Sequence, residues 1–227
     1  ALPILEQVIT EVSEFCTNLG VDLNQIESAE PLQRIGLIDD AFNSILINDQ
    51  TKREYLEHAD NVFKLYKAIL PDLVANDFVS ICSLINIIAR KIRNLTQSAD
   101  ISEVMAEVEN LLDQSIAPEG YVIAEEPGGY ETDRLVDLSQ IDFDQLKARF
   151  NTRHKQIETE KLRGAINRKL SDLIRVNKTR MDYQIKFEQM IAEYNEAAIN
   201  IDAFFEQLIA LARELNDEDQ RTITEKL

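Results

Sequence analysis

The residues that could do chemistry in this chain are two histidines, two cysteines and a few acidic doublets. His58 and His154 belong to no HExxH pattern and to no ExxH pair, so neither lies in a familiar metal-binding motif. Glu54 and His58, four residues apart, could share a helix face, but one carboxylate and one imidazole describe a surface pair better than a metal site. The chain also contains no GxxxxGK[ST] loop and no GxGxxG loop to hold phosphates. The sequence therefore predicts no catalytic, cofactor-binding or metal-binding residue.

The cysteines and the acidic doublets have plainer interpretations. Cys16 and Cys82 form no CxxC motif and lie in apolar helical patterns, which predicts buried, reduced thiols. Acidic residues cluster at 39–40, 125–126 and 217–219. A nuclease site would need a lysine and carboxylates fixed around a metal on neighbouring strands, and these clusters lie on predicted helices or loops. We interpret them as solvated faces, and the last cluster would also suit the start of a final helix.

The strongest charged feature is a basic region between Lys147 and Lys186. Twelve of the 24 basic residues lie here against four acidic ones, so the region carries +8 within a chain of net charge −17. It could contact phosphate or an acidic protein, or it could pack against the acidic remainder of the same chain. No aromatic residue lies between Asn151 and Met181, which argues against base stacking, and we favour a partner or intramolecular role over direct DNA binding. The candidate partner or DNA contacts are Arg163, Arg168, Lys169, Arg175, Lys178 and Arg180.

Helices must position these residues, because 227 residues contain only six glycines and five prolines. Apolar spacing predicts a first helix that ends at Gly20 and a second that begins near Pro31. A third should open with a capping box of Thr51 and Glu54 and end before Pro71. A fourth, nearly all-apolar helix over about 78–95 should be central, and a fifth, capped by residues 100 and 103, should end near 116.

Residues 117–140 interrupt the helical pattern with a cluster of prolines and glycines, which predicts a long loop or a small β-hairpin. Helices resume at 142. One should run to about 152, a second to about 176 and a third over 179–194, and a fourth should begin after Asn200, a predicted cap. We therefore expect an all-α, multi-helix bundle. Its expected parts are a helical subdomain over 1–116, the loop or hairpin over 117–140, and a second helical subdomain over 141–227.

The cellular location is predicted from the targeting and membrane-spanning segments that the sequence lacks. No apolar run reaches the roughly 18 residues needed to cross a membrane, and no secretory signal opens the chain. We expect a cytoplasmic chain with no membrane partner. Its Ala-Leu-Pro start and charged end predict a fragment of a larger protein.

The second half of the sequence resembles a known family. The quoted segments are IDFDQLKARF at 141–150, EKLRGAINRKL at 160–170, NKTRMD at 177–182 and FEQLIALARELNDEDQR at 205–221, with YKAILP at 66–71 also fitting. Their order and spacing resemble the C-terminal helical domain of the R (restriction) subunit of type I restriction–modification enzymes. The resemblance covers most of the chain, is strongest over about 138–221 and includes no catalytic motif.

The resemblance implies a parent endonuclease that hydrolyses ATP, uses Mg and translocates DNA, with the nuclease and ATP sites upstream of Ala1. In such an enzyme this domain docks the R subunit onto the modification and specificity subunits, and it meets DNA through the parent complex. Three alternatives stay open. The 147–186 region could be a DNA-contacting element of the same motor, the chain could be an unrelated helical scaffold, or, least favoured, it could be an enzyme in its own right.

Overall fold

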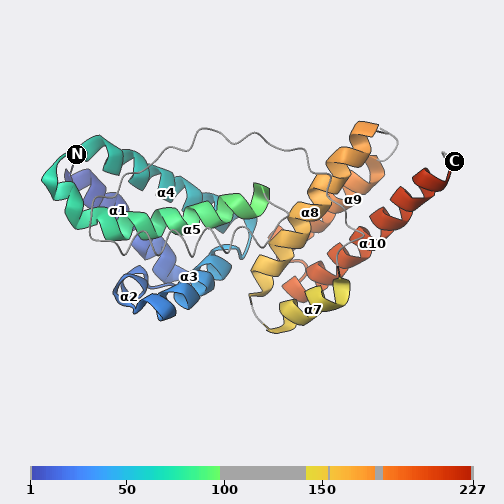
Figure 1. Cartoon of the computed structure of the whole chain (residues 1–227), viewed down its shortest axis with the longest axis horizontal. Coiled ribbons are helices and arrows are strands. Elements are labelled where there is room, and N and C mark those ends of the chain that lie inside the picture. Colours follow the sequence, from blue (N-terminus) through green and yellow to red (C-terminus); the bar gives the residue numbers. More distant parts are fainter. Residues whose placement is uncertain (1, 98–141, 153, 177–180, 226–227) are drawn as a thin grey trace.

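The computed structural model describes residues 2–97, 142–152, 154–176 and 181–225, and the regular elements in these ranges are all helices (Figure 1). They are α1 (Leu2–Asn18), α2 (Leu23–Ser28), α3 (Pro31–Ile45), α4 (Asp49–Ile69), the 3-10 helix η1 (Leu73–Phe78), α5 (Val79–Gln97), α7 (Phe143–Thr152), α8 (Lys155–Val176), α9 (Met181–Asn195) and α10 (Ile201–Glu225). The all-α prediction is confirmed for these residues. The predicted fifth helix and the loop or hairpin at 117–140 lie outside the described residues, and the division into subdomains there stays a prediction.

Most helix ends follow the predicted signals. Gly20 takes a φ of +79° just after α1, and the amide of Val21 reaches back to the carbonyl of Cys16 at 2.9 Å, the hydrogen bond of a Schellman cap. Asn200 caps α10, since its Oδ1 accepts from the amide of Ala203 at 2.9 Å. These contacts satisfy backbone groups that a helix end otherwise leaves unpaired.

Three sequence predictions were wrong in detail. The cap of α4 is Asn48, whose side chain accepts from the amide of Thr51, so the capping box begins three residues earlier than predicted. The short helices α2 and η1 were not predicted, because six residues are too few to show a helical period. The acidic cluster at 217–219 lies inside α10 instead of opening a new helix, since no glycine or proline follows Asn200 to end it.

Residues 2–97, called here the first half, are built around α5. Helix α1 packs along α4, while α5 contacts α2, α3, α4 and η1 (Figure 1). Their buried side chains form a first hydrophobic core, which includes Cys16, Cys82 and the fully buried Tyr55. The Tyr55 hydroxyl donates to the carbonyl of Ile85 at 3.0 Å, so its polar atom is satisfied inside the core. Both cysteines are buried free thiols, as the sequence predicted. Burial raises the pKa of each thiol to about 12.

The sequence predicted no apolar run long enough to cross a membrane, but the helical stretch Leu73–Leu95, averaged over its few polar residues, is long and apolar enough to do so by length and composition alone. Its buried residues Ile85, Ile88 and Ile92 lie in the middle of the first core, and Lys91 on the same helix is buried beside Asp39. We interpret this helix as the central core helix that the sequence predicted.

Residues 142–225, called here the second half, have a separate hydrophobic core among α7, α8, α9 and α10. The rings of Phe150 and Phe205 stack at 3.9 Å between centroids, and those of Tyr194 and Phe204 stack at 4.5 Å. Phe187, Phe204 and Phe205 are buried in this core, and Tyr194 is half-buried at its edge.

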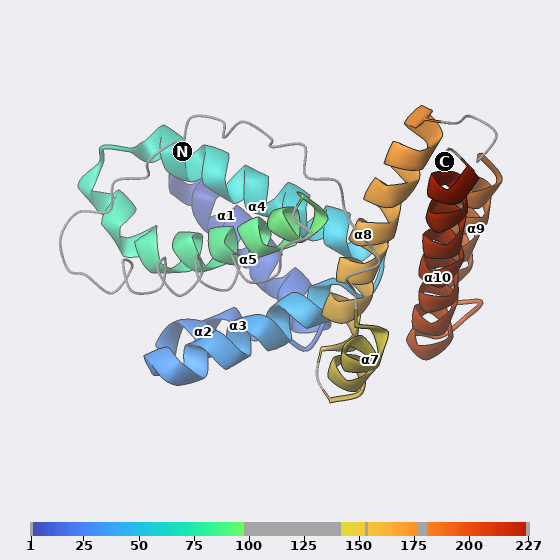
Figure 2. The same cartoon turned by 45° about the vertical axis from the view of Figure 1, so that its right-hand side comes forward.

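Helix α8 joins the two halves (Figure 2). Leu162, Ile166, Leu170 and Leu173 face the second core, whereas Ile157 belongs to the first core. Since residues three and four apart share a helix face, these sets lie on opposite sides of α8. Helix α8, itself part of the second half, therefore lies between the two hydrophobic cores.

Candidate functional site

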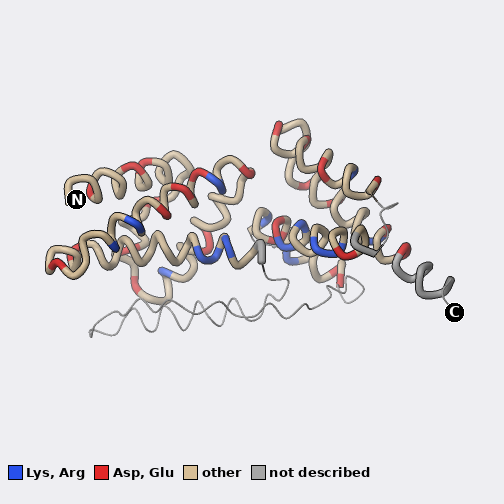
Figure 3. Tube along the Cα trace, turned by 90° about the horizontal axis from the view of Figure 1, so that it is seen from above, with Lys and Arg blue, Asp and Glu red and all other residues tan. Residues whose placement is uncertain are grey.

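The predicted basic region lies on α7, α8 and α9, in the middle of the molecule, where Figure 3 shows many of the Lys and Arg residues. Several of its cations pair with carboxylates of α10. Lys147 lies 2.8 Å from Glu206, Lys155 lies 2.5 Å from Asp202, and Lys186 lies 2.7 Å from Glu214, measured from Nζ to a carboxylate oxygen. These pairs are exposed and individually weak. They nevertheless place an acidic partner beside three of the basic side chains.

Arg163 makes the strongest of these contacts. Its Nη1 and Nη2 donate to Oδ1 and Oδ2 of Asp49, each at 2.7 Å, which is a bidentate pair between α8 and the first turn of α4. Nη1 also donates to Glu160 at 2.8 Å. Lys52 Nζ lies 2.9 Å from both Asp49 and Glu160. Two cations and two carboxylates thus alternate in one partly buried cluster.

The cluster favours the charged forms of Asp49 and Arg163. Burial alone would raise the pKa of Asp49, but the hydrogen bond and charge of Arg163, with help from Asn195 and Lys52, hold it well below its usual value. Burial alone would lower the pKa of Arg163, yet its bonds to the two carboxylates raise it above the ordinary arginine value. Next to the cluster, burial and then the charge of Glu160 raise the pKa of Tyr194 to about 12. Its neutral hydroxyl donates to the carbonyl of Ile47 at 2.8 Å.

Each half also caps a helix of the other half. The Oδ1 of Asn43, on α3, accepts from the amides of Gln156 and Ile157 at 3.2 and 3.4 Å, at the first turn of α8. In return, Oδ1 of Asn195, on α9, accepts from the first amide of α4, that of Asp49, at 3.2 Å. These amides would otherwise be the unpaired donors of a helix N-terminus.

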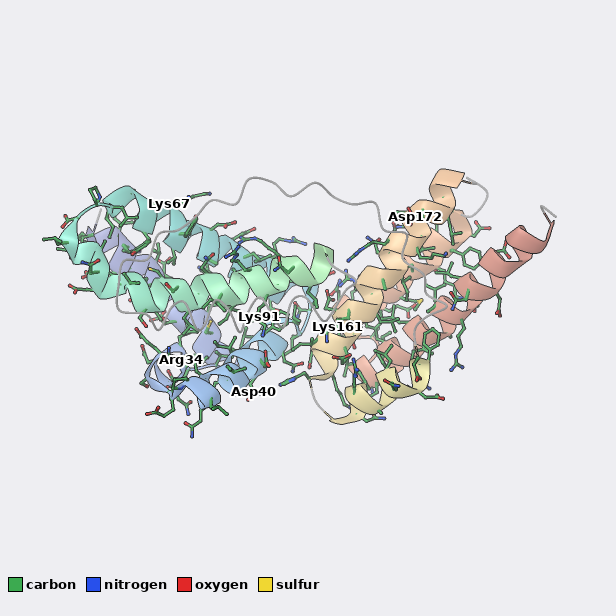
Figure 4. All side chains as sticks on the ribbon, in the orientation of Figure 1. Arg34, Asp40, Lys67, Lys91, Lys161 and Asp172 are labelled. Atoms are coloured by element: carbon green, nitrogen blue, oxygen red, sulfur yellow. The ribbon has the colours of Figure 1, made fainter. Side chains whose placement is uncertain are left out.

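A histidine stands at the start of this contact. His154 precedes α8 with a φ of +49°, and its Nε2 lies 2.9 Å from Oδ1 of Asp40 on α3. In Figure 4, Lys161 lies on the side of α8 that faces the first half, and its Nζ lies 2.7 Å from Glu158 of the same helix. The polar side chains of α3, α4 and α8 therefore meet along one contact.

The predicted contact residues have different fates. Arg163 is engaged inside the chain, as described. Arg168 lies half-buried one turn further along α8, where its Nη2 is buried without a hydrogen-bond partner among the described residues and burial lowers its pKa. Lys169 is half-buried beside it. Arg175 lies within α8 but its side chain is outside the described part, as are Lys178 and Arg180. Their role in contacting a partner or DNA stays a prediction.

Sequence reasoning missed the residues that complete the contact, namely Asn43, Asp49, Lys52 and Asn195. The partners are separated by 108 to 146 residues in the chain. A local pattern carries no signal for such pairs. Among the described residues, no group of three or more His, Cys, Asp or Glu side chains could hold a metal. This arrangement can hold two helical units together and neutralise part of the basic region.

Comparison with known proteins agrees with the resemblance drawn from the sequence. A family model described as "Type I restriction enzyme HindI endonuclease subunit-like, C-terminal" matches residues 1–227. No match was found among curated proteins or among solved structures.

Proposed function

We propose that this chain, which belongs to the family of C-terminal domains of HindI-like type I restriction enzyme endonuclease subunits, docks its parent subunit onto a methyltransferase core. In this proposal the core consists of the modification and specificity subunits of the same cytoplasmic complex. The parent subunit supplies the nuclease and the ATP-dependent DNA translocase, with ATP and Mg bound outside this chain. The domain itself contributes shape and attachment.

The observation that carries the proposal is the internal use of the basic region. Lys147, Lys155, Arg163 and Lys186 all have carboxylate partners within the chain. A cation engaged in this way must give up its partner before it binds a DNA phosphate, which costs the partly buried Arg163 more than the three exposed lysines. An acidic helical domain in which these four cations are paired suits protein attachment better than phosphate tracking.

A second candidate function rests on Arg168. Its Nη2 lacks a hydrogen-bond partner in the described part of the chain, and it lies on the same helix as the basic residues further along. A helical element that contacts DNA during translocation would have to turn this side chain outward, and the missing hydrogen bond of Nη2 lowers the cost of doing so. This function predicts binding that weakens steeply as salt rises.

Titration calorimetry of the chain separates the two functions. The chain is titrated into a purified methyltransferase core on its DNA site, and separately into the same DNA alone, at two salt concentrations. Docking predicts binding that requires the core and depends modestly on salt, and it predicts that Arg168→Gln binds the core as the unmodified chain does. Salt-sensitive binding to DNA alone, lost in Arg168→Gln, would support the DNA-contacting function instead.

A further inference from the structure

We infer that the polar contact between the two halves is a latch, which sets their angle and can open while both hydrophobic cores stay folded. This contact, called the junction, consists of Asp40, Asn43 and Asp49 on the first half and His154, Arg163 and Asn195 on the second. The inference concerns the isolated chain and is independent of the docking proposal.

The two halves share little apolar contact. Among the described residues, Ile157 is the one buried side chain of the second half that joins the first core. The other buried apolar residues of α8 belong to the second core. Contacts between units of one chain that are mainly polar permit relative motion, whereas large apolar contacts prevent it. By this criterion α8 is fixed to the second half and joined more loosely to the first.

The polar bonds of the junction nevertheless define one closed position. A bidentate pair such as Arg163 with Asp49 requires both planar groups to align, so it fixes orientation as well as distance. The reciprocal caps by Asn43 and Asn195 impose the same condition at two more points. All of these groups can bond to water when the halves separate. Opening therefore removes directional contacts and uncovers the first core at Ile157, while the second core stays covered.

The backbone at the start of α8 supports the same conclusion. His154 adopts a left-handed φ of +49°, which non-glycine residues avoid unless their surroundings impose it. Here Asp40 bonds the His154 ring and Asn43 bonds the amides that follow it. Opening would release this residue to an ordinary conformation. The strained residue therefore lies in the junction itself, at the end of α8 that meets the first half.

Distance measurement between spin labels tests the latch in the full chain. Cysteines introduced at the exposed positions Asn61 on α4 and Gln189 on α9 would carry the labels, because Cys16 and Cys82 are buried. The chain with native junction residues should give one narrow distance distribution. The double variant Asn43→Ala, Asp49→Asn should give a second distance population comparable in size to the first, with unchanged helicity by circular dichroism. The control Lys186→Gln removes an ion pair outside the junction and should keep one population.

A single unchanged distribution in the double variant would overturn the latch. Amide hydrogen exchange in the unmodified chain is a second test that does not depend on whether the double variant folds. The amides of Asp49 and Gln156, which are bonded across the junction, should exchange faster than core amides of α5 and α10 such as those of Ile88 and Leu211. Equal protection at all four positions would show one cooperative unit and would also overturn the latch.

Discussion

Removing the guanidinium at the centre of the junction should destabilise the protein far more than removing an exposed cation of the same basic region. The change is Arg163→Ala, and the matched control is Lys186→Ala. Arg163 is bonded to Asp49 at two points and to Glu160 at a third. Lys186 is bonded to one carboxylate, that of Glu214.

The magnitude follows from exposure. The side chains of Arg163, Asp49 and Glu160 are 18%, 22% and 10% exposed, whereas those of Lys186 and Glu214 are 49% and 46% exposed. Removing one partner of a fully buried pair costs about 3–5 kcal/mol, and an exposed pair contributes about 0–1 kcal/mol. The partly buried position of Arg163 places the loss at about 2–3 kcal/mol, because two carboxylates would then share one cation, Lys52. The loss for Lys186→Ala should stay below about 1 kcal/mol.

Urea denaturation followed by circular dichroism measures both free energies of unfolding. A loss of stability for Arg163→Ala no larger than that for Lys186→Ala would refute the reasoning. It would mean that the basic region does not hold the halves together, and the case for internal use of its cations would fall with it.

Four further results are expected. Ala197 takes a left-handed φ of +56° at the end of α9, which costs a non-glycine residue about 1–2 kcal/mol. The change Ala197→Gly removes this cost but increases the conformational entropy of the unfolded chain. It should therefore stabilise the protein by about 0.5–1 kcal/mol in urea denaturation. Gly20→Ala should destabilise it by a similar amount, since the added Cβ meets nothing within 4 Å and only the backbone φ of +79° opposes it. The folded pKa of Asp49 lies below its unfolded value near 3.9, so its stabilisation is fully present above about pH 4 and is lost as the pH falls through the folded pKa. Urea midpoints between pH 5 and pH 2 should therefore fall less steeply in Asp49→Asn than in the unmodified protein, and equal slopes would contradict the assignment. Asn43→Ala should cost about 1 kcal/mol, as the loss of a helix cap does, and should speed amide exchange at the first turn of α8.

The sequence predicted the helices well because their signals are local. Gly20, Pro31 and Asn200 mark helix ends through backbone conformation or capping, and each does so in the structure. The apolar stripes of α5 and α10 identified core helices because a helix repeats its faces every three to four residues. The cap of α4 was misplaced because Asn48 and Thr51 both favour caps and a pattern does not choose between them.

The junction could not be predicted for a different reason. Its side chains come from α3, α4, α8 and α9, and the pairs form only when two folded halves meet. Charge marked Arg163 as a contact residue, but charge alone does not say whether its partner is DNA, another protein or Asp49 of the same chain. The distribution of charge along the chain allowed the basic region to pack against acidic residues of the same chain, but it did not show which acidic residues these are.

The central claim is that this domain attaches its parent subunit to a methyltransferase core. The most direct test is competition, in which the purified chain is added to an assembly of the full endonuclease subunit with that core on DNA, and the bound full subunit is measured. The account predicts that the chain displaces the full subunit in proportion to its concentration. A chain that folds with the expected helicity yet neither binds the core nor displaces the full subunit would contradict the claim.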